Sequence, residues 1–198
     1  MPDGNGIVIM EKPDSITFKD ISDVLRKAHE PHRKNGVIMR VPFLPPEELE
    51  KWVGKDGKCF VAMDGDQLVG TVSFMVRNLK RWYHKGITAE MTMQGVLLSH
   101  QGKHICSMLN QSCEEAIWKN GYQTIYFDTA EANAKRIAIG KKEGFVLVDY
   151  FWTGNHYSVG MMKWLDGCPF STWYCKLRFQ SKRCAVYLKH ALGLYKKK

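Results

Sequence analysis

The spacing of apolar positions predicts that the chain begins with a strand and two helices. A short apolar run at residues 7–10 is typical of a strand. A helix is expected to run from a cap at Asp14 or Ser15 to about residue 30. A second, short helix is expected to open at Pro45 and Pro46, because proline suits the first turn and the acidic residues behind it suit the positive end of the helix dipole.

The rest of the first 164 residues reads as strands interrupted by helices. Strands are expected at 59–63, 68–76, 89–98, 123–127, 145–151 and 156–164, and helices at 102–120 and 130–143. A turn at residues 64–67 joins the first two of these strands, and Gly144 ends the later helix. This mixed order predicts an α/β fold in which helices cover both faces of a sheet.

The positive charge is concentrated at the end of the chain. The 198 residues contain 29 Lys+Arg and 20 Asp+Glu, a formal charge of +9. Residues 165–198 hold eight of the basic residues and only Asp166 as an acid, which leaves residues 1–164 at +2. We therefore expect a nearly neutral domain at 1–164 and a basic, helical extension at 165–198. A nearly neutral domain gives no support for specific binding of nucleic acid.

The extension is predicted to form an amphipathic helix. Its apolar residues recur at near-helical spacing: Trp173, Leu177, Cys184, Leu188, Ala191 and Tyr195. Gln180 and Ser181 interrupt this apolar stripe. Three partners fit such a helix: the domain itself or a partner subunit, the surface of an anionic membrane, and nucleic acid.

The cysteines and the start of the chain predict a cytoplasmic protein. Hydrophobic residues are 44% and charged residues 25%, as in an ordinary globular protein. Residues 1–15 lack the pattern of a signal peptide, and no apolar run approaches the roughly 18 residues of a membrane span. Six cysteines are then expected to be reduced thiols. Because they form no Cys-x-x-Cys pair, we expect no metal site.

The segment from residue 90 to residue 145 carries a motif. A strand ends in Val96-Leu97-Leu98, and the loop Gln101-Gly102-Lys103-His104-Ile105-Cys106 leads into a helix. Asn133 is followed by Gly144-Phe145 at eleven and twelve residues. In this pattern the chain resembles the GNAT acyltransferase superfamily, whose strand ends in Val-x-Pro and whose loop reads Gln/Arg-x-x-Gly-x-Gly/Ala. The resemblance covers about residues 5–164 and implies a mixed, mostly antiparallel sheet.

The resemblance implies that acetyl-CoA is a co-substrate. Amides of a loop and a helix N-terminus bind anions well, and those implied to hold the pyrophosphate belong to Gln101, Gly102, Lys103, His104, Ile105 and Cys106. Main-chain groups of Val96, Leu97 and Leu98 would pair with the pantetheine arm. Asn133 would orient the coenzyme or a bridging water, although it also fits a helix cap.

The resemblance also suggests catalytic residues. Glu90 stands where many members of the superfamily carry a general base, which an amine acceptor requires. Gly140 replaces the tyrosine that usually protonates the departing thiolate, and it marks either a kink or a close contact. Tyr150 and Tyr157, with His156 beside them, are the candidate proton donors in the last hairpin, and water is a further one.

These features predict direct transfer of an acetyl or other acyl group from coenzyme A to an amine, in a small molecule or an amino sugar. A degenerate, non-catalytic acyl-CoA-binding or regulatory module is the alternative, because Gly140, His104 and Cys106 depart from the family pattern. A basic binding protein that uses its extension is a third interpretation. Residues 77–85, basic and aromatic, are expected as a loop that binds an anionic or sugar acceptor or packs on the domain.

Overall fold

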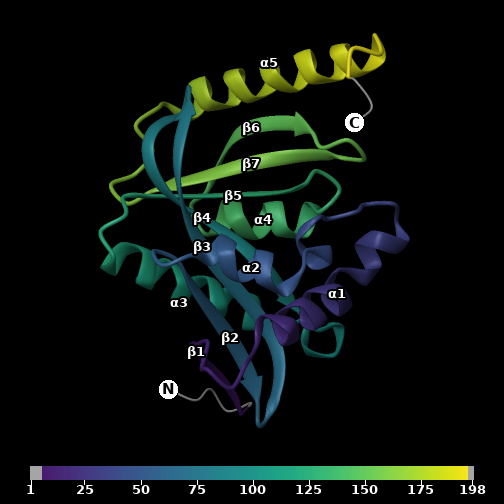
Figure 1. Cartoon of the computed structure of the whole chain (residues 1–198). Helices are drawn as coiled ribbons and strands as arrows, with labels where there is room; N and C mark the ends of the chain where they lie inside the picture. The colour runs from purple at the N-terminus through teal and green to yellow at the C-terminus, as the bar shows by residue number, and fades with distance from the viewer. Residues whose placement is uncertain (1–5, 196–198) are drawn as a thin grey trace. The chain divides into compact units, whose positions relative to one another are not determined.

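The computed structural model describes residues 6–195, in which the chain forms seven strands and five α-helices (Figure 1). The chain divides into two compact units. The first contains the residues up to 79 and residues 86–122, and the second contains residues 80–85 and those from 123 onward. The second unit includes most of the predicted extension. Residues 1–5 and 196–198 of the two predicted regions lie outside the described residues.

The first unit is built on four strands in the order in which they occur in the chain. They are β1 (Ile7–Glu11), β2 (Lys58–Asp64), β3 (Gln67–Arg81) and β4 (His84–Val96). β2 pairs antiparallel with β1 on one side and with β3 on the other. The predicted turn between β2 and β3 is confirmed by the pairing of Asp64 with Gln67.

Three helices and two short 3-10 turns complete this unit. The helices are α1 (Phe18–Lys34), α2 (Pro46–Val53) and α3 (Ile105–Lys119), and the 3-10 turns are η1 (Val41–Phe43) and η2 (Leu98–His100). α1 begins later than expected, because Thr17 caps it instead of Asp14 or Ser15. The Thr17 hydroxyl accepts a hydrogen bond from the Asp20 amide, and the Asp20 carboxylate accepts one from the Thr17 amide. This capping box satisfies two backbone donors at once.

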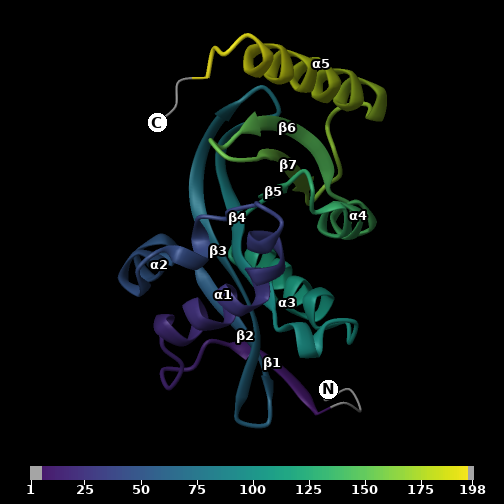
Figure 2. The same cartoon turned by 90° about the vertical axis from the view of Figure 1, so that its right-hand side faces the viewer.

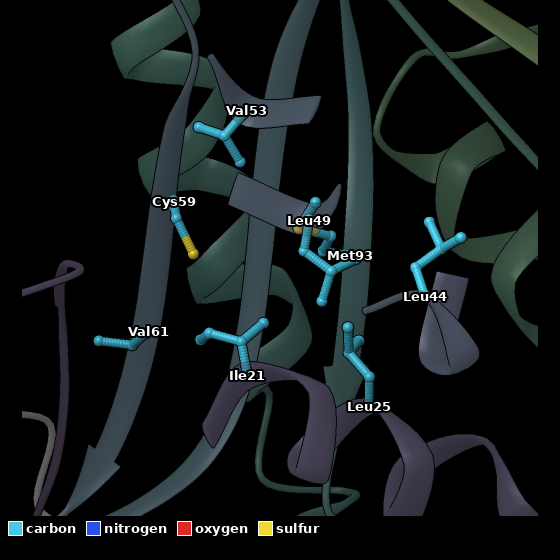
Figure 3. Close-up of a cluster of buried hydrophobic side chains, with 8 residues drawn as sticks. All are labelled: Ile21, Leu25, Leu44, Leu49, Val53, Cys59, Val61 and Met93. Carbon is cyan, nitrogen blue, oxygen red and sulfur yellow. The ribbon is translucent and has the colours of Figure 1, made fainter. Parts of the chain in front are cut away.

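Helices cover both faces of the strands in this unit, as predicted (Figure 2). α1 and α2 pack on one face through a shared cluster of buried side chains: Ile21, Leu25, Leu44, Leu49, Val53, Cys59, Val61 and Met93 (Figure 3). α3 contacts β1 and β2. It comes so close to β3 that a Cβ on Gly70 would lie 3.1 Å from Leu109.

The prediction of a loop at residues 77–85 was wrong. β3 continues to Arg81 and β4 starts at His84, so only a tight turn separates them. Tyr83 in this turn is 3% exposed and stacks on Tyr126 within the second unit. Most side chains in the distal part of this hairpin are exposed or half-buried. They therefore show no alternation of apolar and polar positions, which is the signal that would have predicted the strands.

The second unit has three antiparallel strands, β5 (Thr124–Ala130), β6 (Val146–Trp152) and β7 (Tyr157–Trp164), with β7 in the middle. One helix, α4 (Ala134–Lys142), connects β5 with β6. The other, α5 (Thr172–Ala191), is capped by the Ser171 hydroxyl and packs on β6.

α5 confirms the predicted helix but packs through a different face. Its buried residues are Cys175, Phe179 and Val186, and the last two lie against side chains of β6 and β7. Trp173 and Leu188 of the predicted stripe are 70% and 61% exposed. The inner face was missed because polar and charged residues are interspersed along it, which hides its apolar period. Within residues 6–195, no helix has both the length and the apolar composition that crossing a bilayer requires.

Candidate active site

β4 is distorted near its end, where the resemblance places the coenzyme. Met93 has φ 51°, a backbone conformation that a side-chain-bearing residue seldom adopts inside a strand. Its side chain is nevertheless buried in the cluster beneath α1 and α2, which holds it in place. The next carbonyl, that of Gln94, accepts a hydrogen bond from His29 Nε2 of α1 at 2.9 Å. The backbone groups at this point therefore depart from the regular ladder of the sheet.

His29 is a residue that the sequence interpretation missed. Its Nδ1 is buried and has no hydrogen-bond partner among the described residues. Burial lowers the pKa of His29, although the bond to Gln94 opposes this. The ring is therefore a neutral base, with Nε2 as its donor. The signal was present in the helical period, because His29 follows the buried Leu25 by four residues.

The Gln94 side chain connects β4 to the first turns of α3. Its Nε2 donates to Asn110 Oδ1 and lies 3.5 Å from Cys106 Sγ. Asn110 is 1% exposed and Cys106 is half-buried. These contacts fix the start of α3 relative to the distorted end of β4.

The loop after β4 is held in place from both sides. The Leu97 amide donates to the Val69 carbonyl of β3 at 2.9 Å, and Gln101 Nε2 donates to the Val96 carbonyl at 3.3 Å. His100 Nε2 lies 3.1 Å from an Asp64 carboxylate oxygen in the turn between β2 and β3. These three contacts anchor the loop between β4 and α3.

The same loop leads into the N-terminus of α3, and two of its residues have unusual backbone angles. Gly102 and His104 adopt the left-handed region, with φ 85° and 60°, which suits glycine but costs about 1–2 kcal/mol for histidine. His104 is the N-cap of α3 and, in the described part of the chain, makes no side-chain capping hydrogen bond. Both Lys103 and His104 are exposed. The first amides of α3 and two basic side chains thus form a surface suited to an anion.

Glu90 lies on β4 and is 7% exposed. One of its carboxylate oxygens is 3.0 Å from Arg77 Nε of β3. A carboxylate is the kind of group that can accept a proton as a general base. The first unit therefore contains Glu90 and every predicted coenzyme-binding residue from Val96 to Cys106.

The other predicted site residues belong to the second unit. Asn133 caps α4, since its Oδ1 accepts a hydrogen bond from the Arg136 amide at 3.2 Å and its Nδ2 donates to Thr129 Oγ1 at 3.3 Å. Both polar ends of this side chain are therefore used inside the second unit.

Gly140 is required by close packing of α4. A Cβ at this position would lie 2.9 Å from Phe127 Cζ and 3.2 Å from the Met161 side chain. The close contact that was one of the two expectations for this glycine is therefore present. The tyrosine usual at this position in the superfamily would not fit here.

The tyrosines of the last hairpin are engaged by other side chains. Tyr150 is fully buried and donates its hydroxyl proton to Glu131 Oε2 at 2.6 Å. Burial, followed by this bond, raises the pKa of Tyr150 far above its ordinary value. The Tyr157 hydroxyl contacts His190 Nδ1 of α5, and burial raises the pKa of Tyr157. His156 lies in the turn, where its Nδ1 is 3.1 Å from Thr153 Oγ1 and burial lowers its pKa.

Comparison with known proteins identifies the family. The profile described as "Acetyltransferase (GNAT) family" matches residues 21–145. No match was found among curated protein sequences.

Solved structures share the fold at low sequence identity. An acetyltransferase from Streptococcus agalactiae is 16% identical, with a TM-score of 0.63 over 81% of this chain and 99% of that one. A GNAT acetyltransferase from Elizabethkingia anophelis, solved with acetyl-CoA, is 14% identical, with a TM-score of 0.57 over 81% and 99%. An aminoglycoside 6′-acetyltransferase is 20% identical, with a TM-score of 0.59 over 80% and 97%. The profile match covers more than half of the chain and agrees with the strand, loop and helix described above, and the chain belongs to the GNAT acetyltransferase family.

Proposed function

We propose that this protein transfers an acetyl group from acetyl-CoA to an amine of a small molecule or amino sugar. The observation that carries the proposal is the uncapped N-terminus of α3 behind a loop with two left-handed residues, Gly102 and His104. Such an end offers backbone donors and a positive dipole to the pyrophosphate of the coenzyme. The residues of the loop from Gln101 to Cys106 would provide these contacts.

The end of β4 would hold the pantetheine arm. The Leu97 amide already donates to Val69. Val96 and Leu98 are therefore the residues on either side whose main-chain groups would pair with the arm. We assign Leu97 to anchoring the strand rather than to direct pairing.

Catalysis would be direct transfer within a ternary complex. Glu90 would take a proton from the acceptor, directly or through a water, so that the amine lone pair can attack the thioester carbonyl carbon. A backbone amide near Val96, beside the distortion at Met93, would donate to the carbonyl oxygen as negative charge develops there. The carbon–sulfur bond then breaks, and the thiolate takes up a proton. Holding both reactants side by side would supply much of the rate.

Water is our preferred proton donor for the thiolate. Tyr150 and Tyr157, which the sequence predicts for this role, contact Glu131 and His190 with their hydroxyl groups. The Tyr157 contact is part of the packing of α5, and Glu131 also forms an ion pair with Arg183 of that helix. Asn133 would contribute to the coenzyme site only if one of its capping contacts were exchanged, so we assign it to the α4 cap.

An amino-sugar acceptor is supported by one of the structural relatives, an aminoglycoside 6′-acetyltransferase.

The free state of all six cysteines fits the proposed cytoplasmic location.

Two measurements test the proposal. Acetyl-CoA at millimolar concentration should raise the melting temperature, because it binds only the folded state; no shift would reject a coenzyme site. Thiol release should then be followed with a panel of amines and amino sugars. Glu90→Gln should lower release by about 10²–10⁴-fold while retaining the thermal shift. The matched control is Glu115→Gln, on the exposed side of α3, which should leave both unchanged.

The second candidate function is a non-catalytic acyl-CoA-binding or regulatory module. It is favoured by Gly140, since the packing around it leaves no room for the usual acid. A thermal shift with acetyl-CoA, combined with no thiol release for any amine, would support this module and reject the transferase.

A further inference from the structure

α5 has an inner face whose charged and apolar groups are used within the second unit. Cys175 is buried, and Phe179 and Val186 are buried against β6 and β7. Arg183 forms an ion pair with Glu131 at 2.8 Å, and Lys182 lies 3.6 Å from an Asp149 carboxylate oxygen. These contacts explain why the helix is held on its inner face, and Tyr174 and Arg178 add contacts with Trp82 at its flank.

The opposite side of α5 presents large apolar groups to solvent. Trp173 is 70% exposed, Leu177 47% and Leu188 61%. With the exposed Cys184 between them, these residues recur at spacings of four, seven and four, which return to the same side of an α-helix. Leu192, at the end of the helix, is 62% exposed. Apolar residues collected on one side of an exposed helix mark an interaction surface.

Positive charge surrounds this apolar side. Lys176, Arg178 and Lys189 are exposed on the same helix. From residue 167 to residue 198 the sequence contains eight basic residues and no acidic one. A surface of one sign complements a uniformly anionic partner, and an anionic membrane offers such headgroups beside acyl chains that can take up apolar side chains.

We propose that the outer face of α5, defined by Trp173, Leu177, Leu188 and Leu192, docks onto an anionic membrane surface. The helix would lie in the plane of the interface, with its apolar groups among the acyl chains and its lysines and arginines at the lipid headgroups. This membrane contact is separate from acetyl transfer, because none of these four residues belongs to the proposed active site.

The first test is sedimentation of the full chain with lipid vesicles. The protein should bind vesicles of phosphatidylcholine mixed with phosphatidylglycerol, and binding should weaken steeply as salt is raised, because salt screens exposed charges. Equal binding to vesicles of phosphatidylcholine alone, or no binding to either, would overturn the proposal.

Variants identify the surface. Leu177→Ser combined with Leu188→Ser should lower partitioning by about tenfold or more per leucine, from the lost burial of apolar area. Because both side chains are exposed, the urea unfolding curve should stay as in the wild type. Val8→Ser on β1, where the side chain is 44% exposed, is the matched control and should bind vesicles normally. Unchanged binding by the double leucine variant would refute this assignment.

Two further experiments test whether the lysines of α5 contribute to lipid binding and whether α5 binds a second copy of the chain instead of a membrane. Lys176→Gln and Lys189→Gln should each lower binding by about fivefold, whereas Lys119→Gln on α3, also well exposed, should not. Light scattering in the absence of lipid decides whether α5 binds a second copy instead. A dimer that the double leucine variant converts to a monomer would show a protein interface and overturn the membrane proposal.

Discussion

The N-termini of α3 and α4 differ in what satisfies their first backbone amides. α4 is capped by Asn133, whose side-chain oxygen Oδ1 accepts a hydrogen bond from the Arg136 amide. α3 begins at His104, in the left-handed region, where no side-chain capping bond is made in the described part of the chain. α1 and α5 resemble α4, because Thr17 and Ser171 cap them.

The capped N-terminus of α4 suits stability, whereas the N-terminus of α3 is available to a ligand. A capped end gains about 1 kcal/mol, because the cap satisfies one of the first backbone donors. An open end gives up that stability, and the left-handed His104 adds a further backbone cost. The chain thus has a less stable helix end at the loop that we propose as the coenzyme site.

A negative charge at the open end should have the largest effect. His104→Asp would place a carboxylate near the pyrophosphate, and like charges at roughly 5 Å with an effective dielectric of about 20 repel by about 3 kcal/mol. We expect the Kd for acetyl-CoA, measured by calorimetry, to rise about a hundredfold. Gln111→Glu, two turns further along α3, adds the same charge and should change Kd little. Equal effects of both would show that α3 does not hold the phosphates.

Replacing Gly140 by alanine should destabilise the protein, although alanine usually stabilises a helix relative to glycine. In an ordinary helix alanine is preferred to glycine by about 1 kcal/mol. At residue 140 the contact with Phe127 should instead make Gly140→Ala lower the free energy of unfolding by about 1–3 kcal/mol. Ala138→Gly, at an exposed position of the same helix, should lower it by about 1 kcal/mol. A more stable Gly140→Ala protein would contradict the close packing.

Removing the cap of α4 should affect stability without affecting the ligand. Asn133→Ala should lower the free energy of unfolding by about 1 kcal/mol in urea denaturation, and Asn133→Asp should restore most of it. The Kd for acetyl-CoA should stay unchanged in both. A weaker Kd in both variants would instead assign Asn133 to the coenzyme site.

The smallest effect concerns the pH dependence of the first unit. The pKa of His29 lies below its ordinary value of 6.5 in the folded protein, chiefly because of burial. As pH falls below about 6.5 the unfolded chain binds a proton there before the folded protein does, so the free energy of unfolding should decrease. His29→Gln, which can still donate to the Gln94 carbonyl, should reduce this slope in urea titrations between pH 7 and pH 5. An unchanged slope would show that folding does not lower the pKa of His29.

The element order and the family were available from the sequence, whereas side-chain partners were not. The expected strands and helices are present because their apolar periods reflect burial on one face, as at Ile21 and Leu25 of α1. The hairpin beyond Val76 was missed because exposed strands carry no such period. This part of the hairpin is formed by backbone pairing between β3 and β4, and the pattern of side chains in a single sequence does not predict such pairing.

In the candidate site, too, the local motif could be predicted from the sequence, whereas contacts between distant residues could not. The motif located the loop from Gln101 to Cys106, because backbone geometry there depends on nearby residues. It could not reveal that Glu131 engages Tyr150, since those residues are far apart in sequence and meet only through packing. His29 was missed for the same reason, since its partner is a backbone carbonyl 65 positions away.

The tip of the β3–β4 hairpin has a consequence for how this protein can be synthesised and cut. Tyr83 lies early in the chain, yet it stacks on Tyr126, and its hydroxyl is 3.5 Å from an Asp149 carboxylate oxygen, so it belongs to the second unit. A fragment starting at residue 123 would lack this ring and leave its buried neighbours exposed to water. During translation, Tyr83 must wait for more than forty later residues before Tyr126 exists and for more than sixty before Asp149 exists. Neither unit is therefore a contiguous segment that could be exchanged between proteins by a single crossover.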